Sequence, residues 1–215
     1  MPAAACMIPK TERPTLKYEQ NLWQGGLSLV AGFDEAGRGA MAGPVAVGAV
    51  ILSADDPHLS QTLACSRDSK QMTPRQRDLC APIVKATALA WSVAFASAYE
   101  IDEIGIVAAT RLAAGRTLAA LACIPDYLLT DFRLELPEHD IPQTSLVKGD
   151  VRSLSIASAS VLAKTTRDAL MRELDEQHPG YGLGQNKGYG TQAHRSAMRR
   201  LGYSPIHRKT FSLKR

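Results

Sequence analysis

The sequence predicts an α/β fold: a mixed sheet flanked by helices, followed by a helical, basic C-terminal region. Two short apolar runs, 27–33 and 45–52, lie on either side of glycine-rich turn signals and predict a β-hairpin. Beyond them, strand-like runs alternate with longer helical patterns, as in a sheet that helices cover. No acidic residue follows Glu176, so the end of the chain is basic.

The hairpin opens a single domain that we expect at residues 28–215, after an N-terminal tail at residues 1–27 with weak patterning. The next element is a helix. Thr73 suits its N-cap and Pro74 its first position, while Pro82 should end or kink it.

The second half of the chain alternates strands and helices. Its elements are expected at residues 89–98 (strand), 100–121 (helix), 127–130 (strand), 154–177 (helix) and 191–201 (helix). Gly105 and Gly115 are weak points within the first of these helices. The short strand delivers Asp131 at its end, and Pro179-Gly180 stops the long helix.

The composition is that of a globular protein, with 45% hydrophobic and 21% charged residues, which excludes a fibrous or disordered chain. Neither a signal peptide nor a run of about 18 apolar residues is evident, so we expect no membrane association and a cytoplasmic location. The cysteines have no CxxC spacing, and we expect reduced thiols and no zinc site. They are Cys6, Cys65, Cys80 and Cys123.

The net charge of +4 is unevenly distributed. The segment after Glu176 contains eight of the 25 basic residues and none of the 21 acidic ones, so it carries +8 and the remainder −4. Such a division suggests that a polyanion binds across the C-terminal surface. The alternative is a solvated basic helix that only keeps the protein soluble.

Four acids lie where core packing does not favour them. Asp34 and Glu35 interrupt the end of an apolar run, Asp131 ends another, and Asp150 precedes the long helix. Each alone has an ordinary explanation as a turn residue or an N-cap. Asp34 and Glu35 can share one site only if the strand ends or bends there, because adjacent strand residues point to opposite faces.

If the fold gathers these acids, their charges must be neutralised. Two unit charges 4 Å apart repel by about 4 kcal/mol at an effective dielectric near 20. Carboxylate oxygens suit Mg²⁺ or Mn²⁺, and two such ions could activate water and stabilise the leaving oxygen of a phosphodiester. Gly37-Arg38-Gly39 follows the first two acids, and combines a backbone open to close approach with a charge suited to phosphate.

Six blocks of the sequence, in order, resemble a known family. The stretch from Gly32 to Gly39, continuing to Val45, is similar to the first motif of type 2 ribonucleases H. It begins near the N-terminus, which favours bacterial ribonuclease HII over ribonuclease HIII with its additional N-terminal domain. The other blocks are Asp68-Ser69-Lys70, Lys148-Gly149-Asp150, residues 156–164 with Thr166-Arg167-Asp168, Lys187 to Thr191, and His207-Arg208.

The resemblance implies a ribonuclease H-like fold and a monomer that hydrolyses the RNA strand of RNA–DNA hybrids with Mg²⁺ or Mn²⁺, two ions per site with substrate. It also implies incision on the 5′ side of a single ribonucleotide in duplex DNA, leaving a 3′-hydroxyl and a 5′-phosphate, as the first step of ribonucleotide excision repair. The implied catalytic residues and metal ligands are Asp34, Glu35, Asp131 and Asp150.

Selectivity for the ribonucleotide must depend on its 2′-hydroxyl. The resemblance assigns that recognition to Gly37-Arg38-Gly39 and to Tyr189, whose ring would pack on the adjoining sugar. Asp168 is expected to be a salt-bridge partner, and is the second choice for the fourth acid. Contacts to the phosphate backbone are implied for Lys70, Ser160 and Lys164.

Phe132 departs from the family pattern, which usually has glycine after the third acid, and the large ring is expected to crowd the edge of the site. Two alternatives stay open. One is a nuclease of the same fold that acts on DNA, which would cut an all-DNA duplex as readily. The other is a non-catalytic nucleic-acid binding module, which would bind without cutting.

Overall fold

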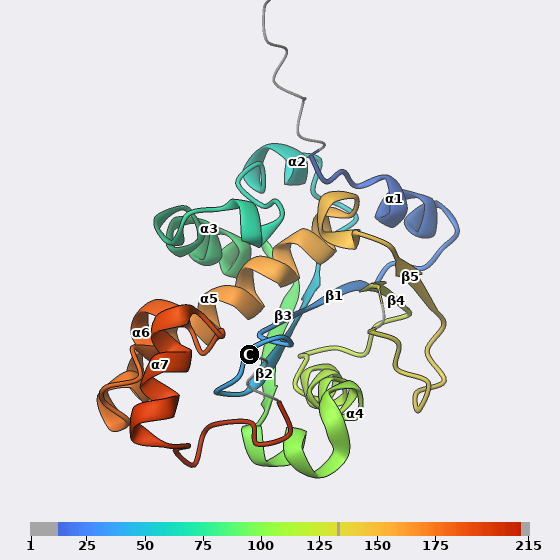
Figure 1. Cartoon of the computed structure of the whole chain (residues 1–215). Helices are drawn as coiled ribbons and strands as arrows, with labels where there is room; N and C mark the ends of the chain where they lie inside the picture. Colours follow the sequence, from blue (N-terminus) through green and yellow to red (C-terminus); the bar gives the residue numbers. More distant parts are fainter. Residues whose placement is uncertain (1–12, 133, 212–215) are drawn as a thin grey trace, which may run out of the picture.

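The computed structural model describes residues 13–132 and 134–211 and places a five-stranded mixed sheet between helices (Figure 1). The strand order is β3-β2-β1-β4-β5. Antiparallel pairs join β1 to β2 and β2 to β3, while β4 runs parallel to β1 and to β5. The predicted hairpin and mixed sheet are therefore confirmed. The strands are β1 Val30–Ala36, β2 Val45–Ile51, β3 Ala90–Ala96, β4 Tyr127–Asp131 and β5 Gln143–Leu146.

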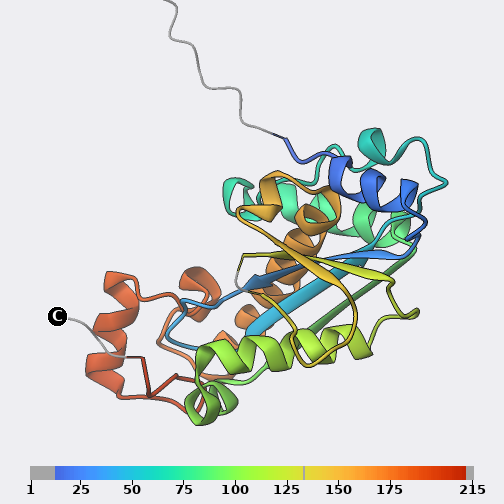
Figure 2. The same ribbon diagram turned by 90° about the vertical axis from the view of Figure 1, so that its right-hand side faces the viewer.

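Helices cover both faces of the sheet. Figure 2 shows α4 on one face and α5, with α1 and α3, on the other. The α-helices are α1 Lys17–Gln24, α2 Leu59–Thr62, α3 Pro74–Thr87, α4 Ala98–Ala119, α5 Leu154–Gln177, α6 Leu183–Asn186 and α7 Gln192–Leu201. The 3-10 helices are η1 Ser69–Gln71 and η2 Gly149–Val151. No helix in these ranges has both the length and the apolar character needed to cross a bilayer.

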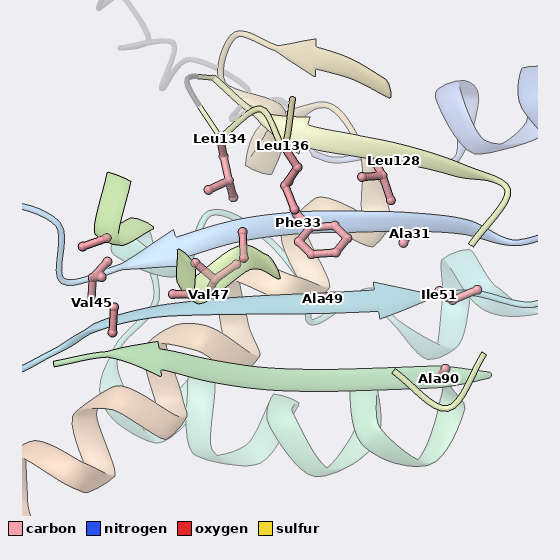
Figure 3. Close-up of a cluster of buried hydrophobic side chains, with 14 of the residues drawn as sticks. Ala31, Phe33, Val45, Val47, Ala49, Ile51, Ala90, Leu128, Leu134 and Leu136 are labelled. Carbon is pink, nitrogen blue, oxygen red and sulfur yellow. The ribbon is translucent and has the colours of Figure 1, made fainter. Parts of the chain in front are cut away.

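The two faces of the sheet pack differently. On the α4 face, Phe33 and its neighbours form an apolar core with the helix (Figure 3). On the other face, α5 approaches the strands almost backbone to backbone. A Cβ atom on Gly32 would lie 2.3 Å from the Ser155 carbonyl carbon, and one on Gly48 would lie 2.5 Å from the Ala159 oxygen. This close approach holds α5 in a fixed position over the centre of the sheet.

The helix starts follow the sequence signals. Thr73 and Gln76 form a reciprocal capping box at α3. The helix does not end at Pro82, contrary to one of the two expected outcomes, but continues to Thr87. Pro82 lies on the exposed side, while Val84 on the other side is buried in the core that α3 shares with α5. That packing outweighs the backbone hydrogen bond that proline removes.

The structure differs from the expected secondary structure in two further places, at the glycines of α4 and at strand β5. Gly105 does break the helical geometry of α4, with φ 79° and ψ 157°, whereas Gly115 stays helical. Strand β5 was not predicted, because the sequence Gln-Thr-Ser-Leu is short, mostly polar and only partly buried at the sheet edge.

The expected N-terminal tail contains a helix. Within α1, the fully buried Glu19 accepts hydrogen bonds from the Ser153 hydroxyl at 2.6 Å and from the Ser155 hydroxyl and N–H at 2.6 and 2.9 Å. These bonds join α1 to the start of α5. No local pattern in the sequence indicates these hydrogen bonds, because the two segments lie more than 130 residues apart. Residues 1–12 lie outside the described residues.

The expectation of reduced cysteines is wrong for one pair. Cys65 and Cys80 form a disulfide, with their Cα atoms 5.7 Å apart. The loop before η1 returns beside α3, which brings the two side chains within bonding range. A spacing of 15 residues carries no such signal in the sequence. Cys123 is a free thiol, and Cys6 lies outside the described residues.

Candidate metal centre

Three acids converge where β1 and β4 part. The parallel pairing of these strands ends at Phe33 and Thr130, and the next residues along the chain are Asp34, Glu35 and Asp131. One carboxylate oxygen from each lies within 4.8 Å of the others. Strand β1 does not end there, since it pairs with β2 as far as Ala36. The strand therefore does not end at the acids, and they lie just beyond the last residues that pair β1 with β4.

Asp34 is the most buried member of this trio, with 1% of its surface exposed. Its Oδ1 accepts the Glu35 N–H at 2.8 Å. Burial raises the pKa of Asp34 well above its usual range, and the charges of Glu35 and Asp131 raise it further. The pKa of Glu35 is also raised, chiefly by burial, although Arg38, 3.6 Å away, acts in the opposite direction.

Two carboxylate oxygens of the site lack a donor. Asp34 Oδ2 and Glu35 Oε2 are buried and accept no hydrogen bond from the described part of the chain. Buried polar atoms are normally satisfied, and a bound divalent cation would satisfy these two and offset the repulsion between the acids. The donor set therefore fits a hard cation such as Mg²⁺ or Mn²⁺.

Asp150 lies beside the trio and not within it. Asp131 Oδ1 accepts the Gly149 N–H at 2.7 Å, which holds η2 against the end of β4. Asp150 follows, 5% exposed, with Lys70 Nζ 3.8 Å from its Oδ2. Burial and the nearby Asp68 raise its pKa to about 6. Asp131, Asp150, Lys70 and Asp68 line one cavity of about 510 Å³.

Phe132 forms part of the wall of that cavity and is 48% exposed. The ring therefore borders the site, as expected of a large residue in place of glycine. Asp131 nevertheless keeps its place at the end of β4 and its bond to Gly149.

A second cavity of about 590 Å³ adjoins the acids and gathers the residues expected to contact substrate. Its lining includes Glu35, Gly37, Arg38, Gly39, Lys70, Lys164 and Tyr189. Tyr189 is 36% exposed, with Lys164 Nζ 5.4 Å from its ring centroid.

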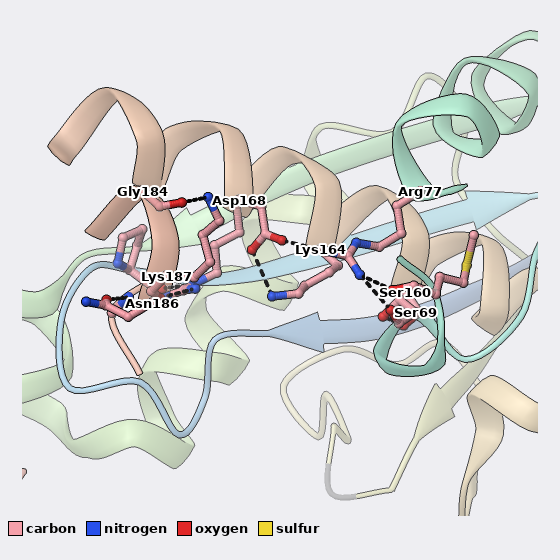
Figure 4. A network of polar contacts seen from close by, with 12 residues as sticks. Ser69, Arg77, Ser160, Lys164, Asp168, Gly184, Asn186 and Lys187 are labelled. Carbon is pink, nitrogen blue, oxygen red and sulfur yellow. Dashed lines mark hydrogen bonds and ion pairs between the residues drawn. The ribbon is translucent and has the colours of Figure 1, made fainter. Parts of the chain in front are cut away.

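Ser160 lies beneath this surface. It is 2% exposed, and its hydroxyl is 2.8 Å from that of Ser69 (Figure 4). The Ser160 hydroxyl also lowers the pKa of Asp34, against the larger effect of burial. Ser160 is therefore buried beside Ser69, and its contact with a phosphate stays a prediction.

Asp168 is confirmed as a salt-bridge partner. Its carboxylate lies 2.8 Å from Lys164 Nζ and 2.9 Å from Arg77 Nη2 (Figure 4). Both partners satisfy its charge, so Asp168 is not the fourth member of the acidic site. Lys164 is thereby oriented along the edge of the second cavity.

Two buried arginines lie behind the Gly37-Arg38-Gly39 loop, and the sequence assigned no role to either, although both belong to blocks that resemble the family. Arg167 and Arg208 are both fully buried. Arg208 belongs to the basic C-terminal segment, so the expectation that this segment is a charged surface is wrong for this residue. Arg199, Arg200 and Lys209 are exposed as expected. Counting charges could not separate the buried arginine from the exposed ones.

Carboxylates at the ends of adjacent parallel strands in a five-stranded mixed sheet define a ribonuclease H-like protein. The ribonuclease H2 of Pyrococcus horikoshii superimposes with a TM-score of 0.71 at 23% identity, covering 85% of this chain and 93% of that one. The RNase HII of Archaeoglobus fulgidus, solved as a complex with PCNA, superimposes with a TM-score of 0.72 at 24% identity, covering 87% and 96%.

Sequence similarity identifies the family. The model of the family described as Ribonuclease HII matches residues 31–214. A ribonuclease HII of Synechococcus sp. is 50% identical over 206 residues, covering 95% of this chain and 91% of the relative. One from Dehalococcoides mccartyi is 44% identical over 213 residues, covering 99% and 96%. The chain belongs to the ribonuclease HII family. It is a metal-dependent endonuclease with ribonuclease H activity on RNA–DNA hybrids.

Proposed function

We propose that the protein, besides cutting RNA–DNA hybrids, incises on the 5′ side of a single ribonucleotide embedded in duplex DNA. The products carry a 3′-hydroxyl and a 5′-phosphate. The observation that supports this proposal is the juxtaposition of Asp34, Glu35 and Asp131 with a cavity lined by the Gly37-Arg38-Gly39 loop and Tyr189. The acidic trio suits a phosphodiester, and the cavity beside it suits a sugar.

The acidic residues would hold Mg²⁺ or Mn²⁺, two ions with substrate bound, through Asp34, Glu35 and Asp131, with Asp150 as the fourth member. Bound ions of this kind polarise a phosphoryl oxygen and lower the pKa of water. The chain itself fixes the carboxylates by burial and through the Gly149 N–H, and Lys70 is attracted to the charges of both Asp34 and Asp150.

The residues of the second cavity would select the nucleotide. The N–H groups of the loop present small donors suited to a 2′-hydroxyl, which only a ribonucleotide has. The partly exposed ring of Tyr189 offers a flat apolar surface to the neighbouring deoxyribose. Lys70 and Lys164 line the same cavity and supply positive charge for the adjoining phosphates.

The decisive experiment uses a DNA duplex that contains one ribonucleotide, incubated with Mg²⁺, with Mn²⁺ and with a chelator, and maps the cut. We expect a single incision 5′ to the ribonucleotide with either metal and none with the chelator. Equal cutting of a matched all-DNA duplex would instead support a DNA-directed nuclease.

Asp34→Asn is the matched control for the metal centre. It removes a ligand charge without altering the exposed basic residues, so cleavage should fall by about 10³-fold, equivalent to several kcal/mol of transition-state stabilisation. Binding to a hybrid should persist. Wild-type protein that binds a hybrid but cuts nothing in either metal would point to a non-catalytic module.

A further inference from the structure

The guanidinium of the buried Arg208 donates three hydrogen bonds to the segment 37–43, which contains the Gly37-Arg38-Gly39 loop. Its guanidinium donates to the carbonyl oxygens of Gly37 at 2.7 Å, Arg38 at 2.8 Å and Gly43 at 3.0 Å. No carboxylate forms an ion pair with it in the part of the chain that the structure describes. Burial lowers the pKa of Arg208 to about 9, which leaves it charged at neutral pH. Three carbonyl dipoles therefore offset its charge.

The hydrogen bonds from Arg208 determine the direction in which the N–H groups of Arg38 and Gly39 point. In a trans peptide the carbonyl oxygen of one residue and the N–H of the next point in opposite directions. Because Arg208 holds the carbonyls of Gly37 and Arg38, the N–H groups of Arg38 and Gly39 point away from it. Neither N–H donates a hydrogen bond within the described ranges. A Cβ atom on Gly39 would meet nothing within 4 Å, so the space beside this residue is open.

A second buried arginine, Arg167, also bonds the backbone next to this loop. It donates to the carbonyls of Ala42, Pro44 and Lys187, at 3.2, 2.8 and 2.9 Å. A Cβ atom on Gly37 would lie 1.9 Å from Arg167 Nε, which requires glycine there in addition to its φ of 85°. The loop and the segment before Tyr189 are thereby held together as one unit.

We propose that Arg208 is a positioning residue for recognition of the ribonucleotide: it holds the loop carbonyls so that the N–H groups of Arg38 and Gly39 face the 2′-hydroxyl. The inference rests on the proposed function. Arg208 touches neither substrate nor metal, and acts only through the backbone. Lysine would keep the charge but lacks the planar fork that bonds three carbonyls at once.

The test measures binding in the non-cleaving Asp34→Asn background, with a duplex containing one ribonucleotide and a matched all-DNA duplex. Adding Arg208→Lys should lower the preference for the ribonucleotide duplex about tenfold, the loss expected for one to two neutral hydrogen bonds. Affinity for all-DNA should stay the same. The exposed Arg199→Lys is the control and should leave the preference intact.

Each result has a defined meaning. A folded Arg208→Lys protein whose preference is unchanged, or whose two affinities fall by the same factor, overturns the proposal and leaves Arg208 a structural role. If Asp34→Asn alone shows no preference while the wild type still incises 5′ to the ribonucleotide, the inference fails and the proposed function stands; if the wild type makes no such incision, the proposed function fails.

A second pair of variants covers the case in which Arg208→Lys does not fold. In the same background, Gly39→Pro removes one of the two N–H groups at a position with open space, and should reduce the preference several-fold. Gly39→Ala keeps the N–H and should cause the smaller loss. Equal losses in the two variants, or a full preference in Gly39→Pro, would overturn the proposal.

Discussion

Individual residues of this protein hold buried charge in two different ways. Asp34 keeps one carboxylate oxygen without a donor, which leaves it available to a cation. Arg208 has its charge surrounded by carbonyl oxygens and is satisfied within the chain. Burying an unpaired charge is costly, so the first arrangement suits a bound cation, whereas the charge of Arg208 is already offset within the chain.

Tyr189→Ala should impair cutting at single ribonucleotides far more than it impairs folding. The ring is 36% exposed, so its loss should cost stability little, whereas losing an aromatic surface against a nucleotide costs about 1–3 kcal/mol, or about 5- to 150-fold in kcat/KM. Kinetics on a one-ribonucleotide duplex and thermal unfolding measure the two effects. Tyr189→Phe, which keeps the ring, should retain most of the activity. Parallel losses of stability and activity in Tyr189→Ala would indicate a packing role.

The sequence predicted the acidic residues of the site better than the buried residues that surround the site. Asp34, Glu35 and Asp131 were identifiable because they end apolar runs and because the resemblance to type 2 ribonucleases H implies them as a set, although each alone has an ordinary explanation. The burial of Ser160 and Arg208 depends on which segments pack over them, and neither local composition nor spacing contains that information.

Among the elements, α5 determines the geometry of the site, because it lies directly on the backbones of β1 and β2. Its length was predicted correctly from the sequence, whereas its closeness to the sheet was not. Glycine is disfavoured in strands, but Gly32 and Gly48 are the points at which helix and sheet meet. The close contact between the sheet and α5 explains why glycine stands at these two positions.

Gly48→Ala should destabilise the protein by about 2–4 kcal/mol, because the added methyl group would overlap the Ala159 oxygen and push α5 away. Gly115→Ala is the matched control, since its Cβ would meet only His139 Nε2 at 3.6 Å. The control should be neutral or stabilising by up to about 1 kcal/mol, as alanine favours a helix. Urea unfolding of both variants measures the difference, and equal stabilities would contradict this account of the contact.

The Cys65–Cys80 disulfide joins α3 to the loop that leads to Asp68, Ser69 and Lys70. A bridge over about 15 residues contributes roughly 3 kcal/mol through the unfolded chain. Thermal unfolding with and without a reductant should therefore show a lower Tm under reducing conditions. Cys80→Ser should abolish this dependence, whereas Cys123→Ser should preserve it. A wild-type Tm that does not respond to the reductant would show that the bridge contributes nothing.

At the scale of the whole molecule, the acidic centre opposes folding when no metal is bound. Burial raises the pKa values of Asp34, Glu35 and Asp150 above those of the unfolded chain. Such groups support the folded state fully only below their ordinary pKa values, near 4, and that support is lost as the pH rises through their folded values, about 6 for Asp150. Stability without metal should therefore decline over this range.

Asp34→Asn should unfold at a higher temperature than the wild type at pH 8 in chelator, because it removes a buried charge. The difference should shrink towards pH 4, where the wild-type carboxyl is protonated. Mg²⁺ or Mn²⁺ at pH 8 should raise the wild-type Tm more than that of the variant. Differential scanning calorimetry at the two pH values tests each point, and a variant less stable than the wild type at pH 8 would contradict it.

The order of the strands along the chain also determines how the protein can fold during its synthesis. Strand β1 is made early, but its parallel neighbour β4 begins about 100 residues later and the covering helix α5 about 120 residues later. A nascent chain must therefore carry its first apolar hairpin, uncovered on one face, until α5 leaves the ribosome. The cluster of Asp34, Glu35 and Asp131 cannot form before Asp131 has been added, so on the proposed assignment the metal centre is completed only late in synthesis.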